Sequence, residues 1–302
     1  MIGVIGSGNV GANTAFFLAE RGVDDVRLYD VKEGLATGKA LDMMEAAPIR
    51  GYRTRISGVD SLGPIKESDV IVLAAGSVRK PGMRREDLLE ANRGAVLAVA
   101  RELRGYAGKV IVVTEPVDLL TTLFLREAQL PPARVLGLGG CLDSARLRQL
   151  IADELSVSPE NVTATVVGRH SDDMIPLPDY CRVSGVPVDR LLGPERIRAL
   201  FAATRDAGGL IVELAQRANA FYGPSAVAAD LAEAIVQDRH AIASVSLLFT
   251  GQYGISGVAM SLPAVLGRGG IERVLSPRLT GSQEDLLRKS AEELRRILAE
   301  RA

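Results

Sequence analysis

Short apolar runs alternate with helix-like stretches through the first half of the chain. Each run lasts four to six residues, and most are unbroken rather than alternating with polar positions, which is typical of strands covered on both faces. Strands of this kind separated by helices predict a parallel sheet with crossover helices. The predicted strands are Ile2–Ile5, Val26–Tyr29, Thr54–Ser57, Val70–Ala75, Val110–Thr114 and Val135–Leu138.

The pattern changes after Gly139-Gly140, where longer helices and isolated strands follow. The expected helices begin at about Leu142, Pro194 and Gln283, with a bend in the second at Gly208-Gly209. The expected strands are Val162–Val167, Ala241–Phe249 and Gly257–Leu262. We therefore predict an α/β protein in which a Rossmann-type parallel-sheet domain at residues 1–138 precedes an α+β catalytic domain at residues 139–302.

A glycine-rich segment joins the first predicted strand to the helix after it. It reads Gly6-Ser7-Gly8-Asn9-Val10-Gly11, an order that lets the backbone approach a pyrophosphate and aim helix N–H groups at it. Asp30 ends the second strand 19 residues after Gly11, where a carboxylate accepts from both hydroxyls of an adenosine ribose. The alternative is an ordinary tight turn with a surface aspartate. The spacing favours a dinucleotide site. Because the Asp30 carboxylate repels a 2′-phosphate, we expect NAD rather than NADP, and the positive charge of Lys32 should reduce this preference.

Composition narrows the class of partner. The 302 residues carry a net charge of −1, so no basic field is expected to hold nucleic acid or an anionic membrane. No apolar run reaches the length of a membrane span, and a strand beginning at Ile2 leaves no room for a signal peptide. The two cysteines, Cys141 and Cys181, are expected to be free thiols. We therefore expect a cytoplasmic protein whose partners are small molecules or copies of itself.

Only two histidines are present, which narrows the choice of proton carrier near neutral pH. His170 follows the predicted strand Val162–Val167 on a polar loop, whereas His240 precedes a strand and is expected at the surface. Asp143 and Arg146 are three positions apart near a helix start and so share a face. An aspartate beside an imidazole fixes its tautomer and stabilises the imidazolium. His170 with Asp143 is the candidate proton donor and acceptor, and a structural histidine is the alternative.

Two arginines six positions apart lie in the segment Arg79-Lys-Pro-Gly-Met-Arg-Arg85, which follows the fourth predicted strand. A guanidinium grips a carboxylate with two parallel charge-assisted bonds, and a glycine lets the loop fold over a bound molecule. The spacing therefore suits a small dianion, although an isolated arginine pair is more often a solvated basic loop.

Taken in order, these motifs resemble the lactate/malate dehydrogenase family from end to end, and within it the compact malate-dehydrogenase type of bacteria and archaea. The matching segments are Gly6–Gly11, Gly38-Lys-Ala-Leu-Asp42, Arg79–Arg85, Leu88-Leu-Glu-Ala-Asn92, Pro116-Val-Asp118, Leu142-Asp-Ser-Ala-Arg146 and Gly168-Arg-His170. The resemblance implies reversible hydride transfer between NAD and carbon 2 of (S)-malate or oxaloacetate. It also implies a place in the tricarboxylic acid cycle and a homodimer or homotetramer.

The resemblance also implies a role for each site residue. His170 held by Asp143 exchanges the proton, Arg85 polarises the carbonyl, and Arg146 clamps the carboxylate beside the reacting carbon. Arg79 aligns with the position that separates malate from lactate enzymes and would bind the distal carboxylate. Gly223 is a small residue at a position where lactate enzymes carry threonine, which also favours a malate enzyme. The implied substrate-binding set is Arg79, Arg85, Arg146 and Glu115, and the implied cofactor-binding set is Gly6, Ser7, Gly8, Asn9, Val10, Gly11, Asp30, Asn92, Val113, Thr114 and Glu115.

Glu115 departs from the family, which has an asparagine at this position that touches both substrate and nicotinamide ribose. If ionised about 6 Å from a substrate carboxylate, Glu115 would repel it by about 3 kcal/mol at an effective dielectric of about 20. Three interpretations are open: a nearby guanidinium neutralises Glu115, burial keeps it protonated, or it depresses catalysis.

The loop after His170 departs as well, with Ser171 in place of glycine and Asp173 in place of serine or threonine. We expect the extra carboxylates to raise the pKa of His170. A metal centre built from His170, Asp172 and Asp173 is rejected because one histidine with adjacent carboxylates gives poor ligand geometry. Two rival functions remain: a dehydrogenase of another 2-hydroxy acid such as lactate, and a catalytically silent or weakly active dinucleotide-binding protein.

Overall fold

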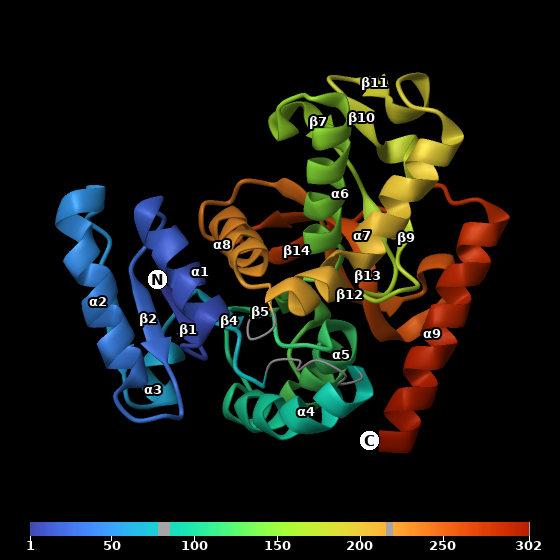
Figure 1. Cartoon of the computed structure of the whole chain (residues 1–302). Helices are drawn as coiled ribbons and strands as arrows, with labels where there is room; N and C mark the ends of the chain where they lie inside the picture. Colours follow the sequence, from blue (N-terminus) through green and yellow to red (C-terminus); the bar gives the residue numbers. More distant parts are fainter. Residues whose placement is uncertain (78–84, 216–219, 302) are drawn as a thin grey trace.

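A computed structural model of the chain describes residues 1–77, 85–215 and 220–301, without the side chains of residues 85 and 86. Its centre is one nine-stranded sheet with the order β14-β13-β12-β6-β5-β4-β1-β2-β3 (Figure 1). The six strands of the first half are parallel, whereas β12, β13 and β14 are antiparallel. The mixed α/β class with a Rossmann-like parallel sheet, predicted from the apolar runs, is confirmed.

The parallel strands agree closely with the predicted runs. They are β1 (Ile2–Ile5), β2 (Val26–Tyr29), β3 (Ile56–Val59), β4 (Val70–Leu73), β5 (Lys109–Val112) and β6 (Val135–Gly137). All four residues of β1 and of β4 are buried, as unbroken apolar composition predicts for strands with helices on both faces. The third strand begins at Ile56 rather than Thr54, because Thr54 and Arg55 lead into the sheet before the register with β2 starts.

Helices cover both faces of this sheet. The first-half helices are α1 (Asn9–Glu20), α2 (Leu35–Arg50), α3 (Leu62–Ile65), α4 (Arg85–Glu102) and α5 (Val117–Ala128). In Figure 1, α4 and α5 lie together below the strands, and α1 packs against α8 above them. Helix α5 is buried nearly all round, as expected for a helix enclosed between α4 and the strands β12 and β13.

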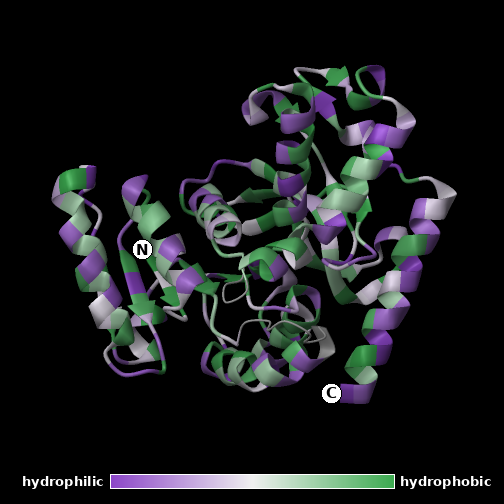
Figure 2. Ribbon diagram, viewed as in Figure 1, coloured by the Kyte–Doolittle hydropathy of each residue, from purple (hydrophilic) through white to green (hydrophobic). Residues whose placement is uncertain are grey.

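The second half adds strands to the same sheet and four long helices. The helices are α6 (Gly140–Leu155), α7 (Pro194–Ala215), α8 (Tyr222–Val236) and α9 (Gly281–Arg301), and the strands are β12 (Ala241–Thr250), β13 (Ser256–Gly267) and β14 (Gly270–Val274). Figure 2 shows hydrophobic and hydrophilic residues alternating along α9, which buries a single stripe ending at Leu298. Strand β12 joins the parallel sheet through Ser246 opposite Gly137, so strands from both halves form one layer. The domain boundary at residue 138 stays a prediction.

One prediction in this half is wrong. The expected strand Val162–Val167 is split into β7 (Val162–Thr163) and β8 (Val166–Val167), because β7 pairs with β10 (Arg182–Val183) and β8 pairs with β9 (Ile175–Pro176) in separate small sheets. Helix α7 continues through Gly208 and Gly209, and the bend expected there stays a prediction. The remaining short elements are β11 (Val186–Pro187) and the 3₁₀ turns Pro132–Arg134, Pro159–Asn161, Pro178–Tyr180, Val188–Arg190 and Gln252–Gly254.

Helix α6 starts at a point where there is no space for side chains. A Cβ on Gly140 would lie 2.5 Å from the carbonyl oxygen of Val166, so only glycine allows the first turn of α6 to touch β8. The Gly140 N–H donates to Ser261 Oγ at 2.8 Å, and Ser144 Oγ donates to the Gly140 carbonyl at 2.6 Å. This close packing fixes the height and rotation of α6, and with them the direction of Asp143.

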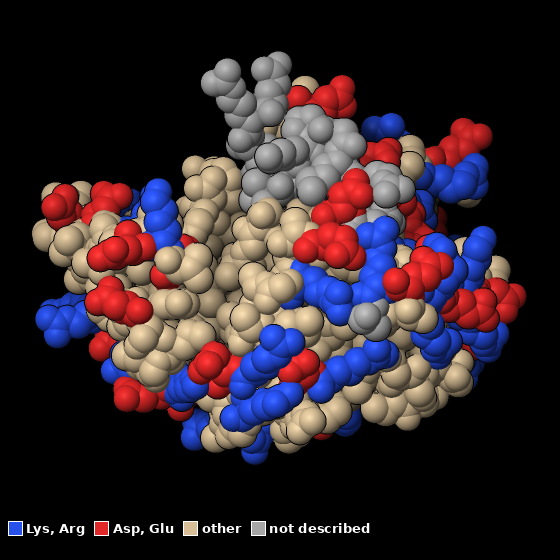
Figure 3. Space-filling model, turned by 90° about the horizontal axis from the view of Figure 1, so that it is seen from below, with Lys and Arg blue, Asp and Glu red and all other residues tan. Residues whose placement is uncertain are grey.

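Charges of both signs are mixed on the face seen from below in Figure 3, where blue and red side chains lie side by side. Such mixing gives no continuous positive field on that face. Within the part of the chain that the structure describes, none of the helices has the length and apolar character needed to cross a membrane. Cys141 and Cys181 are both free, as predicted.

Candidate functional site

Four loops at the carboxyl ends of parallel strands meet at one edge of the sheet. They follow β1, β4, β5 and β6, and β1 and β4 are the neighbouring strands at which the chain order reverses. In open α/β sheets this switch point is where ligands bind. A cavity of about 190 Å³ opens there, and its walls include Val113, Thr114, Glu115, Arg146 and His170.

The glycine-rich loop after β1 has space for a ligand at one glycine and none at the other two. A Cβ on Gly6 would lie 2.6 Å from Ala75, and one on Gly11 would lie 1.8 Å from the carbonyl oxygen of Gly6. At Gly8, by contrast, no described atom lies within 4 Å of the added Cβ. Gly8 is the N-cap of α1 and no side chain caps that helix. An uncapped helix N-terminus with open space in front of it suits a pyrophosphate.

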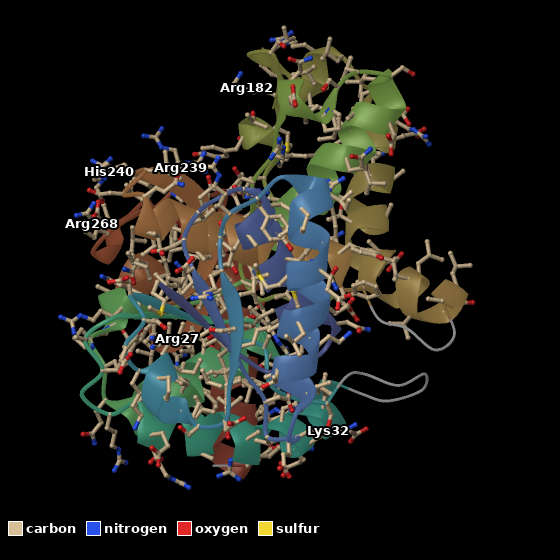
Figure 4. The ribbon with its side chains drawn as sticks, turned by 90° about the vertical axis from the view of Figure 1, so that its left-hand side faces the viewer. Arg27, Lys32, Arg182, Arg239, His240 and Arg268 are labelled. Carbon is tan, nitrogen blue, oxygen red and sulfur yellow. The ribbon has the colours of Figure 1, made fainter. Side chains whose placement is uncertain are left out.

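Asp30 and the glycine loop are tied together. The Ser7 N–H donates to Asp30 Oδ2 at 2.7 Å, and the Lys32 N–H donates to Asp30 Oδ1 at 2.9 Å. The carboxylate therefore sits beside the loop, where the ribose next to a bound pyrophosphate would lie. The Lys32 side chain is exposed ahead of α2 at the protein surface (Figure 4). Asn9 is exposed and Val10 half-buried on the same loop, while Ser7 is buried.

Asn92 links the second and third loops of the site. Its Oδ1 accepts from the Ser77 N–H at 2.6 Å, and its Nδ2 donates to the carbonyls of Ser77 at 3.1 Å and Glu115 at 2.8 Å. The side chain is fully buried. Thr114 Oγ1 donates to the Ala75 carbonyl at 2.8 Å, so the loops after β4 and β5 are joined twice. In the structure the Asn92 amide is hydrogen-bonded to these two loops, so direct contact between Asn92 and the cofactor stays a prediction.

Helix α6 and the loop after β8 bring Asp143 and His170 together, although 27 residues separate them in sequence. His170 Nδ1 lies 2.7 Å from Asp143 Oδ2. The other carboxylate oxygen of Asp143 lies 3.5 Å from Arg146 Nη1, one helical turn further on. Both groups are buried, with 7% of the His170 side chain and 1% of the Asp143 side chain exposed. The pairing expected from the spacing of these residues is thus present as geometry.

Glu115 faces the other ring nitrogen of the same histidine. Its Oε1 lies 3.1 Å from His170 Nε2, and its Oε2 accepts from the Val117 N–H at 3.2 Å, in the first turn of α5. With 37% of its side chain exposed, Glu115 reaches solvent, and burial gives no reason for it to be protonated. His170 therefore stands between a buried and a partly exposed carboxylate.

These two carboxylates decide the charge of His170. Burial by itself would lower the pKa of His170, but the charges of Asp143 and Glu115, together with hydrogen bonds to both, outweigh it and raise the pKa to about 10. The predicted source of a raised pKa was wrong: Asp173 is turned toward Ser171 and toward Ser290 of α9. In the resting site His170 is an imidazolium at neutral pH.

Asp118 holds the main chain of His170, a role that the sequence reasoning missed. Its Oδ2 accepts from the His170 N–H at 2.7 Å, and its Oδ1 accepts from Ser246 Oγ at 2.5 Å. Burial raises the pKa of Asp118 to about 6, against the effect of these two hydrogen bonds. A single aspartate in the apolar run Val117-Asp-Leu-Leu120 was the available signal, because a buried carboxylate needs hydrogen-bond donors.

Within the described residues, two guanidinium groups line the cavity from different helices. Arg146 comes from α6 and Arg205 from α7. The sequence motifs gave no reason to expect Arg205, because an arginine in an amphipathic helix ordinarily faces solvent. The predicted residue Arg79 lies outside the described residues, and so does the side chain of Arg85, whose backbone begins α4.

His240 lies apart from the site. It is exposed beside Arg239 and Arg268 at the surface (Figure 4). Its Nδ1 lies 2.8 Å from Glu272 Oε2, which ties the turn after α8 to β14. The prediction that His240 is a surface residue at a strand end is confirmed.

A dinucleotide cradle that opens on the same cavity as a carboxylate-held imidazole and a guanidinium defines a dehydrogenase of small organic acids. The comparisons agree. A family model described as lactate/malate dehydrogenase, NAD binding domain, matches residues 1–137, and one described as lactate/malate dehydrogenase, alpha/beta C-terminal domain, matches residues 141–302. The chain belongs to the lactate/malate dehydrogenase family, and its dinucleotide cofactor is NAD.

Relatives match over the full length. A malate dehydrogenase of Thermomicrobium roseum is 42% identical over 299 residues, which cover 98% of this chain and 96% of the relative. The crystal structure of Cryptosporidium parvum malate dehydrogenase superposes with a TM-score of 0.96 at 34% identity, covering 99% of this chain and 98% of that one. A lactate dehydrogenase from the same organism, complexed with lactic acid and NAD, gives a TM-score of 0.95 at 32% identity, covering 100% and 98%. The fold therefore does not separate the two kinds of enzyme.

Two glycine variants test the cofactor cradle. Gly8→Ala should fold with unchanged Tm, because the added methyl group meets open space, yet bind NADH at least tenfold more weakly, because that space is where the pyrophosphate is expected to bind. Gly11→Ala should lower Tm by several degrees, since its methyl group meets the Gly6 carbonyl. Calorimetry for NADH affinity and thermal unfolding for Tm separate the two effects. Unchanged NADH affinity in Gly8→Ala would place the pyrophosphate elsewhere.

The imidazolium of His170 makes stability depend on pH. Because the folded-state pKa is raised from 6.5 to about 10, this contribution is complete below about pH 6.5 and disappears as the pH rises toward 10. Relative to His170→Asn, the free energy of unfolding of the wild type should fall by roughly 3 to 5 kcal/mol over that range, at about 1.4 kcal/mol per pKa unit. Urea unfolding at pH 6, 8 and 10 measures it. A difference between wild type and variant that stays constant with pH would contradict the prediction.

Proposed function

We propose that this chain is a malate dehydrogenase, which transfers a hydride reversibly between NAD and carbon 2 of (S)-malate or oxaloacetate. The observation that carries the proposal is the pair of contacts on one helix: Asp143 holds the His170 ring at 2.7 Å, and Arg146 stands one turn further along the same cavity wall. Relatives about 40% identical over the whole chain are named malate dehydrogenase, which favours malate over lactate.

The chain supplies orientation and a proton, while NAD supplies the hydride acceptor or donor when bound. Since Asp143 occupies Nδ1 of His170, Nε2 is the nitrogen that faces the substrate oxygen. During reduction the imidazolium gives its Nε2 proton to the oxygen that becomes the hydroxyl group, and during oxidation the neutral ring takes this proton back. Asp143 holds the ring and stabilises its charged form.

The carboxylate next to the reacting carbon is assigned to Arg146. The Arg146 side chain is 16% exposed and its bond to Asp143 is long, at 3.5 Å, so the remaining donors of its guanidinium can form a two-bonded pair with a substrate carboxylate. Arg85 and Arg79 remain assigned by resemblance to the carbonyl oxygen and the distal carboxylate. The nicotinamide end of NAD is assigned to the loop Val113–Glu115, which lines the same cavity.

Glu115 competes with the substrate in this scheme. It lies against the ring nitrogen that must meet the reacting oxygen, so it has to leave Nε2 before the substrate binds there. Of the three interpretations of Glu115, protonation by burial is disfavoured by its exposure. The contact keeps His170 in its charged form. The charged ring can supply the proton for oxaloacetate reduction, but it cannot act as the base that malate oxidation needs. The same contact is the observation that favours a weakly active homologue as the second candidate function.

Self-association to a dimer or tetramer, a cytoplasmic location and a place in the tricarboxylic acid cycle complete the proposal. The apolar helix α8 is largely buried and packs against α1. On α2, Met43 is buried, but Leu41 is 63% exposed and Ile49 is 87% exposed. The outer face of α2 is therefore the better candidate for contact with a second copy.

Oxidation of NADH with oxaloacetate tests the function directly. The wild type should show steady turnover, and His170→Asn should lose at least 10³-fold in kcat, because the proton donor is gone. His240→Asn is the matched control, since it removes the exposed histidine and should leave turnover unchanged. A substrate panel with pyruvate and 2-oxoglutarate should favour oxaloacetate. NADH binding without turnover of any of these acids would support the silent alternative.

Replacing Glu115 by the asparagine of the family should raise kcat/KM for oxaloacetate by roughly tenfold, because the competing and repelling carboxylate is removed. It should also lower the pH at which malate oxidation begins, since the loss of one carboxylate lowers the pKa of His170. Glu115→Gln keeps the length and removes only the charge, so it should reproduce the pH effect. Steady-state rates from pH 6 to 10 in both directions measure this. An unchanged or reduced kcat/KM in Glu115→Asn would mean that the site accommodates the carboxylate.

A further inference from the structure

Two serines lie opposite each other on the long antiparallel strands that the second half of the chain adds to the sheet. Ser246 of β12 pairs with Ser261 of β13 in the register of these strands, so both side chains stand on the same face of the sheet. Both residues are completely buried. A buried hydroxyl is costly unless it is hydrogen-bonded, so the partners of these two residues, here called the serine pair, indicate what the pair supports.

Ser261 contacts the two segments that carry Asp143 and His170. Its Oγ accepts from the Gly140 N–H at 2.8 Å, at the start of α6 and three positions before Asp143. The Ser261 N–H donates to the Gly168 carbonyl at 2.8 Å, and the Gly168 N–H donates to the Ser261 carbonyl at 2.9 Å. Because Gly168 lies two positions before His170, one residue of β13 ties the helix that carries the aspartate to the loop that carries the histidine.

Ser246 acts on the same loop through Asp118. Its hydroxyl donates to Asp118 Oδ1 at 2.5 Å, while Asp118 Oδ2 accepts from the His170 N–H at 2.7 Å. The hydroxyl therefore fixes the rotation of the carboxylate, and the carboxylate fixes the main chain of His170. Ser246 also lies opposite Gly137 of β6, so this support is anchored in the parallel sheet.

The segment after β6 lies directly against the serine pair. A Cβ on Gly137 would lie 3.0 Å from the Cβ of Ser246, and a Cβ on Gly139 would overlap Ser261 Oγ. Contacts this close require glycine at both positions and leave no space in which the two serine side chains could shift. The two hydroxyls are thus held in place, and so are the groups that they bind.

We propose that Ser246 and Ser261 are positioning residues for His170, which keep its ring at bonding distance from Asp143 and aim its second nitrogen at the substrate. This inference rests on the proposed function and extends it to residues that do not line the cavity. A misplacement of about 1 Å can reduce the rate of a reaction by about 10²-fold. Loss of either hydroxyl should therefore affect the chemical step more than the binding of the cofactor.

Replacing each serine by alanine tests the kinetic effect. Ser246→Ala and Ser261→Ala should each reduce kcat for oxaloacetate reduction by about tenfold, because the pair of His170 and Asp143 loses part of its support. NADH affinity should stay within about twofold of the wild type, because the cofactor loop follows β1 on another part of the sheet.

Thr122→Val is the matched control for stability. It removes a buried hydroxyl that accepts from the Ala259 N–H at 2.9 Å and joins α5 to β13, without contacting His170 or Asp143. This variant should lower Tm about as much as the serine variants do, because each change leaves one buried group without its partner. Its kcat should equal that of the wild type.

Histidine NMR measures the position of the ring without turnover. The chain has only two histidines, so protein labelled with ¹⁵N at histidine gives the signals of two imidazole rings, and the exposed His240 serves as the reference. The proton between His170 Nδ1 and Asp143 should resonate at low field, because the bond is short and charge-assisted. Both serine variants should shift this signal toward higher field, whereas Thr122→Val should leave it in place. The His240 signals should not change in any variant.

An unchanged His170 signal in both serine variants would refute the positioning role, whatever the turnover. Serine variants that lower Tm but keep the kcat of the wild type, as Thr122→Val should, would likewise show that the pair only stabilises the fold. The proposed function fails separately: a wild type that does not turn over oxaloacetate would refute the dehydrogenase, while a shifted His170 signal in the serine variants would still support their role.

Discussion

The buried bond between Asp143 and the His170 ring is the interaction on which the site depends. It joins a helix that starts at the carboxyl end of β6 to a loop that follows β8, and at 2.7 Å it leaves only one ring nitrogen to face the cavity. A buried carboxylate is costly unless it is paired and hydrogen-bonded. Here the imidazolium and the guanidinium of Arg146 both meet that need. The same carboxylate therefore sets the tautomer of the ring and the position of the substrate clamp.

The short contact between Asp143 and His170 depends on how the surrounding strands and helices pack. Helix α6 is held against β8 and β13 by glycine at position 140, whose N–H is taken up by Ser261. The main chain of His170 is held by Asp118, which is in turn bonded to Ser246 of β12. Strands from the second half of the chain thus fix residues that work with the parallel sheet of the first half. Because the sheet is continuous, it fixes the positions of the imidazole, the aspartate and the cofactor loop relative to one another.

Glu115 adds a feature that separates this site from a plain aspartate–histidine pair. A ring with carboxylates at both nitrogens is most stable as an imidazolium, because a neutral ring would turn a lone pair toward one of them. Asn92 accepts and donates across the neighbouring loops, and it fixes the main chain of Glu115 through the carbonyl oxygen. With its carbonyl oxygen held by Asn92, Glu115 is expected to move its carboxylate away from the ring by rotation of its own side chain. Charge balance in the cavity consequently depends on which anions, internal or bound, meet His170, Arg146 and Arg205.

The sequence by itself determined the α/β class, the six parallel strands, the glycine loop with Asp30 and the pairing of Asp143 with His170, because each depends on local periodicity or on a motif of fixed spacing. It misplaced the strand Val162–Val167, since the pairing partners of β7 and β8 decide where each strand ends. Only the tertiary structure brought Glu115 to the second nitrogen of the His170 ring, Asp118 to the main chain of His170, and Arg205 into the cavity. These contacts join side chains from elements far apart along the chain, and no local pattern records which way a helix face or a loop side chain turns once the layers have packed.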